Sequence, residues 1–175
     1  MGMQSRSLLM ATVAVSMTAC GGGEDSAPPA TREISKASLI EKADVMCRRD
    51  QERLSAKLQA LPKLPEGSTT RAARVRLIAP VLEANAQTIL SGARRIAALG
   101  RPTTDAALFD EFLNARRTAG NALQRAAEAA RANDPADLRE ASELFNNNEA
   151  QALGIRFGFK ACGLGLNSAP TPAER

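Results

Sequence analysis

The 175-residue chain is 44% apolar and 3% aromatic, and its formal net charge at pH 7 is +4. It contains no His, Trp or Tyr, which excludes catalytic dyads that need imidazole, the usual zinc sites and His-ligated haem. The small net charge and the scarcity of aromatic side chains argue against a nucleic-acid-binding protein. An alanine-rich composition favours helices over sheets.

Residues 1–19 have the features of a secretory signal peptide. Arg6 supplies a positive charge, an apolar run follows over residues 8–19, and small residues precede Cys20. The run is too short to cross a bilayer, which takes about 20 apolar residues. Its last residues, MTAC, resemble the lipobox of bacterial lipoproteins, although Met17 stands where that family usually has Leu. The resemblance implies that Cys20 is lipidated and becomes the first residue after cleavage; plain secretion or an uncleaved anchor is the alternative.

Two further segments have compositions typical of unfolded chain. Residues 20–37 begin with Cys20 and are rich in Gly, Pro and Ser, which predicts a flexible tether. Residues 164–175 are expected to form a disordered tail. The segment between them, residues 38–163, is long enough for one domain with one core.

The cysteines predict a disulfide. Three are present, and two are left once Cys20 carries lipid. In an oxidising compartment, Cys47 and Cys162 are then expected to be paired. Closing a loop of this length stabilises a fold by about 4–5 kcal/mol on the chain-entropy estimate. The alternative is a reactive thiol pair, for which the sequence offers no activating environment.

Capping and periodicity predict the first two helices. Ser38 followed by Glu41 is a capping box, and the apolar spacing behind it predicts a helix over residues 38–61. The segment LPKLPEGS then breaks the chain, and a second helical stretch is expected over residues 69–99. Pro80 lies inside this stretch, where proline removes a backbone donor and clashes with the preceding turn. We therefore expect a kink or break near Pro80, with the residues before it forming a separate turn or short helix.

The last two helices are predicted from apolar stripes with steps of three and four residues. The third begins at Thr103 or Thr104, and the fourth has Asp134 as N-cap, Pro135 at its first position and a stripe that continues to Cys162. Short connections make successive helices antiparallel. The predicted fold is all-α: an antiparallel up-down-up-down four-helix bundle with one disulfide between the first helix and the end of the fourth.

Three short segments, SLIEKADVMC, AARANDPADLREA and LGIRFGFKACG, resemble a family of small exported bacterial lipoproteins of unassigned function. The shared features are an Ala-Asp then Cys segment in the first helix and a Gly then Cys-Gly segment that closes the last. The resemblance covers residues 38–163. It implies an exported helical domain with Cys47 and Cys162 paired and with Asp44 and Gly163 as matched positions, and it implies no activity.

Arginines gather in the second helical stretch. Such a strip can rest on anionic lipid headgroups or dock an acidic partner; the alternative is a solvated face without a function. Asp50 lies on the core side of the first helix and is expected at the level of Arg94 and Arg95. An ion pair is sufficient to explain a carboxylate at that position. The strip is interrupted only by Glu83 and consists of Arg71, Arg74, Arg76, Arg94 and Arg95, with Arg101 just beyond it.

Polar residues also interrupt the apolar stripes. Three of them lie on otherwise apolar faces: Asn85, Arg116 and Asn148. Along the bundle, Asn85 and Arg116 are expected at nearly the same level, and Gln151 is expected closer to that level than Asn148 is. A polar layer inside a bundle can bind a small polar or anionic ligand. More often, such residues fix the register of the helices or reach the surface.

The sequence offers no set of catalytic groups. It contains no arrangement of paired carboxylates, nucleophile with base, or phosphate-cradling loop, and Met46 is the single methionine beyond the signal segment. We therefore expect no catalytic activity, no metal and no cofactor. The expected function is that of a membrane-anchored envelope lipoprotein whose helical domain binds an envelope protein, a polymer or the membrane surface. The alternative is a small-ligand-binding or sensor bundle that uses a polar layer around Arg116.

The expected location follows from the predicted anchor. The protein is exported and held in the cell membrane or outer membrane by lipid on Cys20, facing the periplasm or the exterior. Gly21 stands where an Asp tends to retain Gram-negative lipoproteins at the inner membrane, which favours the outer membrane if the host has one. The expected partners are the membrane itself and an envelope protein or anionic surface at the basic face of the second helix.

Overall fold

The structure is a computed structural model that describes residues 32–61 and 70–163, excepting the side chains of residues 71 and 72. The signal segment, Cys20, most of the predicted tether and the predicted tail at residues 164–175 lie outside the described residues. The predictions made for those residues therefore stay predictions, but the end of the predicted tether was wrong: residues 33–37 form a short strand, a helix cap and the first residues of a helix.

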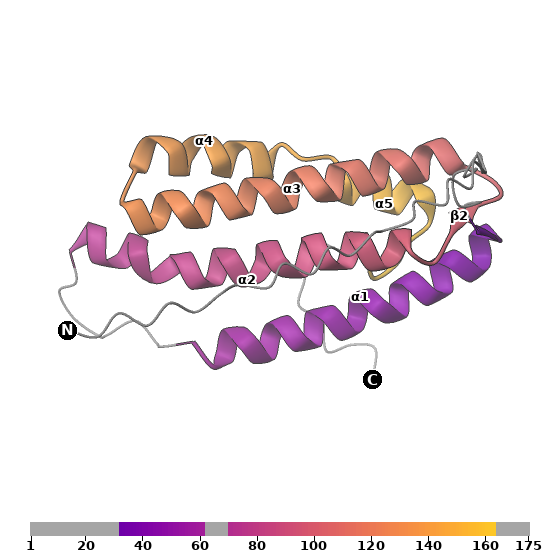
Figure 1. The fold of residues 1–175 in the computed structure, drawn as a ribbon, viewed down its shortest axis with the longest axis horizontal. Helices are drawn as coiled ribbons and strands as arrows, with labels where there is room; N and C mark the ends of the chain where they lie inside the picture. Colours follow the sequence, from indigo (N-terminus) through magenta and orange to yellow (C-terminus); the bar gives the residue numbers. More distant parts are fainter. Residues whose placement is uncertain (1–31, 62–69, 164–175) are drawn as a thin grey trace, which may run out of the picture. The chain divides into compact units, whose positions relative to one another are not determined.

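Most of the described chain is helical, which confirms the class that the composition predicts (Figure 1). The strands β1 and β2 are two residues long and pair in parallel, with Glu33 opposite Arg101 and Ile34 opposite Pro102. In chain order the elements are β1 (Glu33–Ile34), α1 (Lys36–Gln59), α2 (Arg71–Ala97), β2 (Arg101–Pro102), α3 (Ala106–Ala132), α4 (Pro135–Asn146) and α5 (Ala150–Phe157).

The start of α1 lies one turn earlier than the predicted capping box. Ser35 is the N-cap, and its Oγ accepts a hydrogen bond from the backbone N–H of Ser38 at 3.3 Å. Ser38 is therefore inside the first turn and is capped by another serine, so its assignment as the cap was wrong. Two serines three residues apart offer the same local signal, and the helix uses the earlier one.

The second helix is continuous through Pro80. Thr70 caps α2 by accepting a hydrogen bond from the backbone N–H of Ala73 at 3.3 Å, and the helix continues from there to Ala97. The separate short helix expected before Pro80 is therefore not formed. Pro80 is exposed, whereas Ala79 beside it is buried in the core. The missing N–H thus falls on the solvent side of α2, where water can satisfy the unpaired carbonyl.

The predicted fourth helix is interrupted at Asn148. The side chain of Asn148 donates from Nδ2 to the carbonyl of Ala115 on α3 at 2.9 Å. Its Oδ1 accepts a hydrogen bond from the backbone N–H of Ala150, the first residue of α5, at 2.8 Å. Asn148 therefore lies between α4 and α5 and attaches their junction to α3.

The last helix also ends earlier than predicted. Gly158 adopts a left-handed conformation with φ of 107° and forms the C-cap of α5. Cys162 consequently lies in the turn after α5 and not on a helical stripe. Glycine is the usual residue for such a cap because it has no Cβ to clash.

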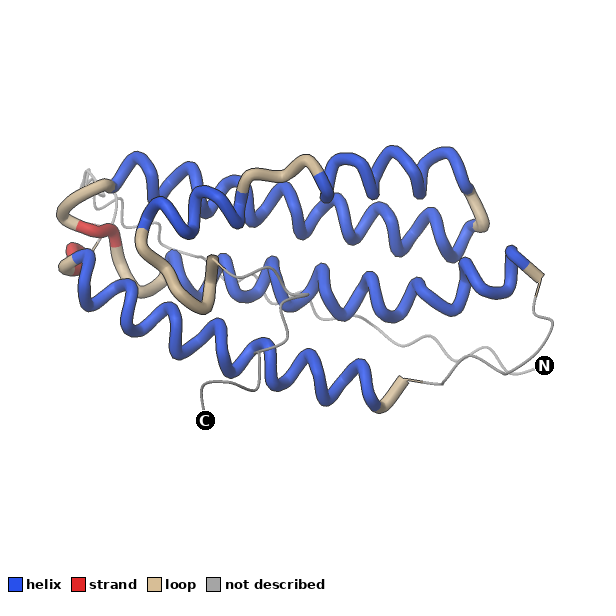
Figure 2. Tube along the Cα trace, turned by 180° about the vertical axis from the view of Figure 1, so that it is seen from behind, coloured by secondary structure: helices blue, strands red, loops and turns tan. Residues whose placement is uncertain are grey.

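The core lies along α3, which packs against α2 and against α4 and α5; α1 packs against α2 (Figures 1 and 2). A small cluster of Ala86, Ile89 and Leu123 fills the α2–α3 interface. At Gly120, a Cβ would come within 2.6 Å of the Leu90 side chain, so α3 approaches α2 closely there. The larger cluster surrounds the disulfide and includes four phenylalanines: Phe109, Phe112, Phe157 and Phe159.

Candidate functional site

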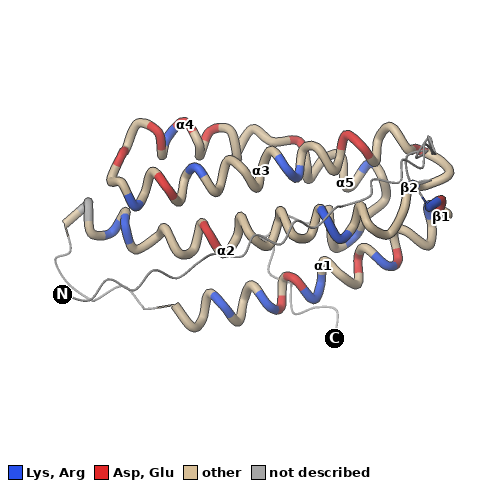
Figure 3. The backbone as a smooth tube through the Cα atoms, viewed as in Figure 1, with Lys and Arg blue, Asp and Glu red and all other residues tan. Residues whose placement is uncertain are grey.

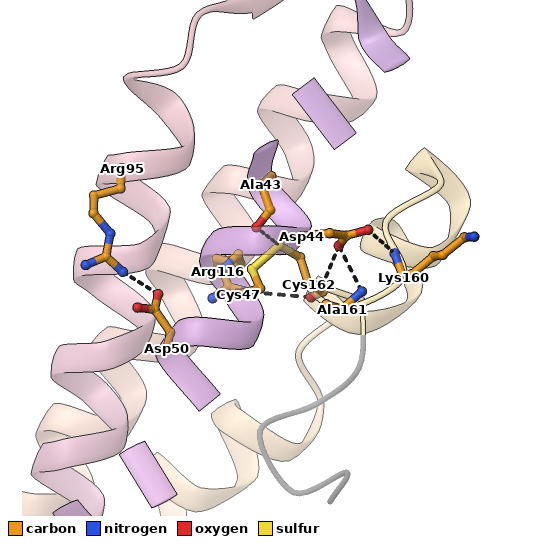
Figure 4. The surroundings of a disulfide bond; sticks show 9 residues. All are labelled: Ala43, Asp44, Cys47, Asp50, Arg95, Arg116, Lys160, Ala161 and Cys162. Carbon is orange, nitrogen blue, oxygen red and sulfur yellow. Dashed lines mark hydrogen bonds and ion pairs between the residues drawn. A yellow bond between two sulfur atoms is a disulfide. The ribbon is translucent and has the colours of Figure 1, made fainter. Parts of the chain in front are cut away.

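The turn after α5 is attached to α1 by a disulfide bond and by hydrogen bonds to a carboxylate (Figure 4). Cys47 and Cys162 are bonded, with their Cα atoms 5.3 Å apart, which confirms the predicted pair. One turn before Cys47, the buried carboxylate of Asp44 accepts hydrogen bonds from three successive backbone N–H groups. The donors are Lys160 at 2.9 Å, Ala161 at 2.8 Å and Cys162 at 3.0 Å. Successive peptide N–H groups form a concave anion site, and here the anion is part of the same chain.

Two glycines let this turn lie against α5. A Cβ on Gly163 would stand 2.9 Å from the carbonyl oxygen of Phe159, and a Cβ on Gly154 would stand 3.1 Å from the Cα of Gly163. In the sequence, Asp44 and Gly163 are marked only as positions matched by the resemblance. Their contacts give both a structural role: Asp44 satisfies the N–H groups of the turn, and Gly163 permits its close approach to the backbone.

The guanidinium of Arg116 lies between α3, α2 and this turn. Its Nη1 donates to the carbonyl of Cys162 at 3.4 Å, and its central carbon lies 5.6 Å from the centre of the Phe112 ring. Burial lowers the pKa of Arg116, and the negative charge of Asp50 partly opposes this effect. The buried Nε of Arg116 has no hydrogen-bond partner among the described residues.

Asp50 forms an ion pair with one arginine, Arg95, and its negative charge acts on a second, Arg116. Asp50 is 8% exposed and forms an ion pair with Nη2 of Arg95, as the sequence predicts for one of the two neighbouring arginines. Gly92 leaves space beside both Asp50 and Arg116: a Cβ there would lie 3.3 Å from Oδ2 of Asp50 and 3.4 Å from Nη2 of Arg116. The Asp50 carboxylate thus stands between the exposed face of α2 and the interior guanidinium.

The predicted polar layer is not assembled around Arg116. Asn85 donates from Nδ2 to the carbonyl of Val81 in its own helix at 2.8 Å. Asn148 is occupied at the α4–α5 junction, and Gln151 is exposed. None of these three amides forms a hydrogen bond with Arg116 among the described residues; the charged group that acts on it is Asp50, the ion-pair partner of Arg95.

The predicted basic strip divides into two groups (Figure 3). Arg74 is exposed near the start of α2, whereas Arg94 is exposed near its end. On an ideal helix these two positions are about 30 Å apart along the axis and about 200° apart around it. Glu83 lies between them in the sequence and pairs with Arg131 of α3. Arg74 and Arg94 therefore belong to separate surfaces.

The second group forms part of a cleft of about 360 Å³ between α1 and α2. Its floor includes the buried side chains of Asp50 and Leu54. Four cations line it against the one carboxylate: Arg53 and Lys57 from α1, and Arg94 and Arg95 from α2. We call this site the α1–α2 cleft.

Most of the positive charge in the α1–α2 cleft is not neutralised. Arg95 pairs with Asp50, but Arg53, Lys57 and Arg94 form no ion pair with a described residue. Asp50, Arg53 and Lys57 are spaced by three and four residues, so they share one face of α1. That spacing is visible in the sequence, but only the structure shows that this face meets the one carrying Arg94.

An acidic groove of about 640 Å³ lies on the other side of α3, along the α4–α5 junction. Its lining includes Glu111, Glu140, Glu143 and Glu149 together with the exposed Leu144. Within residues 32–61 and 70–163, no three potential ligand side chains stand close enough to hold a metal ion. Among the same residues, none of the helices combines the length and apolarity that spanning a membrane requires.

No family model, no curated protein and no solved structure matches this chain. The resemblance of its segments to exported lipoproteins therefore stays a prediction.

Proposed function

We propose that this chain is an exported, lipid-anchored envelope protein whose helical domain binds an anionic partner and carries out no catalysis. The observation that supports it is the charge of the α1–α2 cleft, where four cations from two helices surround one buried carboxylate. Like charges held close together repel one another, so an anion that enters the cleft removes an unfavourable interaction and gains charge-assisted hydrogen bonds.

The anchor is the second part of the proposal. The signal segment and the MTAC junction support lipid on Cys20, and the polar tether that follows would hold the domain close to the membrane surface. The partner is then a component of the envelope: a protein, a polymer or the membrane surface. The protein would lie in the cell membrane or outer membrane and face the periplasm or exterior.

The proposed arrangement of the domain is an antiparallel up-down-up-down bundle in which α4 and α5 together take the place of the fourth helix. Short connections between α2 and α3 and between α3 and α4 support alternating directions. We propose in addition that α2 bends at Pro80, because the ring of a proline displaces the carbonyl one turn before it.

A ligand-binding or sensor function centred on Arg116 is the second candidate. The unpartnered Nε of Arg116 supports it. Against it, the same guanidinium already donates to Cys162 and lies over Phe112, and the predicted amides do not surround it. The α1–α2 cleft is therefore the better candidate for binding.

Fatty-acid labelling in the native host tests the anchor. The wild-type chain should incorporate a labelled fatty acid, and the Cys20→Ala variant should not. A variant lacking both Cys47 and Cys162 should keep the label, because neither cysteine is the proposed acyl site. Equal labelling of the wild type and Cys20→Ala would overturn the anchor.

Sedimentation with envelope vesicles from the native host tests the binding. The full chain carrying Cys20→Ala should pellet with the vesicles at low salt and be released at high salt, because screening weakens charge pairing. The double variant Arg53→Glu/Arg94→Glu should stay in solution. The control Arg117→Glu/Arg139→Glu changes the net charge equally at exposed positions outside the cleft. If both double variants behave alike, the cleft is not the binding site.

A further inference from the structure

We propose that the α1–α2 cleft binds glycerol phosphate, either as the headgroup of an anionic lipid or as a free phosphorylated polyol. This inference depends on the proposed anionic partner and narrows its chemistry to a phosphate on a body that carries hydroxyl groups. Three properties of the cleft support it: cations without an ion-pair partner, hydroxyl oxygens that can only accept hydrogen bonds, and apolar side chains beside the buried carboxylate of Asp50.

The cations fit a phosphate group. Arg53 and Lys57 of α1 line the cleft together with Arg94 of α2, and none of the three has a described ion-pair partner. Arginine presents a planar set of donors that binds a phosphate through two hydrogen bonds, and lysine adds a compact charge. A free phosphate monoester carries about 1.5 to 2 negative charges at pH 7, so it compensates these cations better than a single carboxylate does; the phosphodiester of a lipid headgroup carries one negative charge and offers oxygens to the same planar set of arginine donors.

The hydroxyl groups of the cleft favour a ligand that also donates hydrogen bonds. Thr88 and Ser91 line the α2 side. Oγ1 of Thr88 donates its proton to the carbonyl of Ala84 at 2.8 Å, and Oγ of Ser91 donates to the carbonyl of Thr88 at 3.3 Å. The hydroxyl protons are therefore engaged, and the oxygens have only lone pairs left for a ligand. The hydroxyls of glycerol can donate to them, whereas inorganic phosphate as the dianion has one proton to give.

The floor and size of the cleft fit a small polyol. Leu54 from α1 and Leu90 from α2 contribute apolar side chains against which carbon atoms can pack. The volume of about 360 Å³ is near the lower end of small-molecule sites. Arg53, Lys57 and Arg94 are exposed at the rim, so the phosphate can enter from solution or from a membrane surface beside the domain.

Calorimetric titration of the purified full chain in mild detergent tests the proposal. Glycerol 3-phosphate should bind saturably and more tightly than inorganic phosphate or glutarate, and glycerol should not bind. Arg94→Gln should weaken binding of glycerol 3-phosphate by about tenfold or more, the cost of losing a charge-assisted pair. Arg117→Gln, an exposed arginine of α3 outside the cleft, should bind as the wild type does. Thermal melting of each variant checks that it is folded.

A second variant isolates the hydroxyl contribution. Thr88→Val keeps the shape of the side chain and removes its acceptor, so it should weaken glycerol 3-phosphate binding and leave the affinity for inorganic phosphate unchanged. Three results would overturn the proposal: no saturable binding of glycerol 3-phosphate, equal binding of glutarate, or equal affinities for Arg94→Gln and Arg117→Gln.

Vesicle flotation separates the two sources of the ligand. Binding to vesicles that contain phosphatidylglycerol, but not to pure phosphatidylcholine, together with loss of binding in Arg94→Gln, assigns the lipid headgroup. Binding of soluble glycerol 3-phosphate without flotation assigns a free polyol phosphate. The chain could sediment with native envelope vesicles in a way that requires Arg53 and Arg94 and yet not bind glycerol 3-phosphate. That result would support the anionic-partner proposal and overturn this narrower one.

Discussion

The carboxylate of Asp44 accepts a hydrogen bond at 3.0 Å from the backbone N–H of Cys162, the residue whose sulfur is bonded to Cys47 one turn further along α1. The turn that follows α5 is therefore attached to α1 twice, once by a covalent bond and once by a buried carboxylate. This double attachment fixes the end of the described chain against α1, the helix that supplies half of the α1–α2 cleft.

Replacing Asp44 should destabilise the fold. Asp44→Ala leaves the N–H groups of Lys160, Ala161 and Cys162 without their acceptor, and we expect a loss of about 3 kcal/mol in the free energy of unfolding. Asp44→Asn keeps one acceptor oxygen and should lose less. Urea unfolding of the oxidised protein measures both. Glu41→Ala, at an exposed position on the same helix, should stay within about 0.5 kcal/mol of the wild type; a similar result for Asp44→Ala would show that these hydrogen bonds contribute little.

The disulfide should contribute a large share of the stability. It joins residues 115 positions apart, and the chain-entropy estimate for such a loop is about 4–5 kcal/mol. We expect Cys47→Ser/Cys162→Ser to lower the free energy of unfolding by about this amount. Urea unfolding with and without reductant provides the control, since reductant should destabilise the wild type and leave the double variant unchanged. Equal stabilities for the oxidised wild type and the double variant would contradict the estimate.

Asp50 and Arg116 should be energetically coupled. Asp50→Asn removes the negative charge that faces the interior guanidinium, and we expect it to cost about 2–3 kcal/mol of stability. In an Arg116→Met background, the same substitution should cost about 1–2 kcal/mol less, because the uncompensated charge is no longer present. A double-mutant cycle based on urea unfolding measures the difference. Strictly additive effects would mean that Asp50 acts only through Arg95.

Replacing Pro80 should stabilise the protein. Proline in a helix interior costs about 3 kcal/mol relative to alanine, and Pro80 is exposed within the continuous α2. We expect Pro80→Ala to raise the free energy of unfolding by about 1–3 kcal/mol, as read from the urea midpoint. Gln87→Pro, at another exposed position of α2, should do the opposite. A loss of stability in Pro80→Ala would mean that the packing of the neighbouring Ala79 requires the bend at this residue.

The extent to which the sequence predicts the fold differs from helix to helix. The apolar stripe of the predicted third helix correctly indicates α3. The stripe of the predicted fourth helix, in contrast, continues without a change of period across the break between α4 and α5. Asn148 occupies a regular position on that stripe, so periodicity alone cannot show that its side chain forms hydrogen bonds to the backbone of Ala115 and Ala150 at a break between two helices. The pairing of β1 with β2 is equally invisible, because two-residue strands carry no pattern of their own.

The site is predictable only in part for a similar reason. Arg94 and Arg95 are conspicuous in the sequence, and the disulfide sets the register of the helices that brings Asp50 to their level; of the two, Arg95 forms the ion pair. The contribution of Arg53 and Lys57 depends on how α1 is rotated about its own axis relative to α2. Helical spacing shows which residues share a face, but not which face of the neighbouring helix they meet.

Site-specific photo-crosslinking in the native host tests the central claim, that this domain binds an anionic envelope partner in the α1–α2 cleft, most directly. A photoreactive residue at Arg53 or Gln87 samples the cleft and leaves Arg94 and Arg95 in place, whereas one at Arg117 provides a control on α3. We predict a discrete adduct, protein or lipid by mass spectrometry, from the two cleft positions and none from the control. Adducts of equal yield from all three positions, or no adduct from the cleft, would contradict the account.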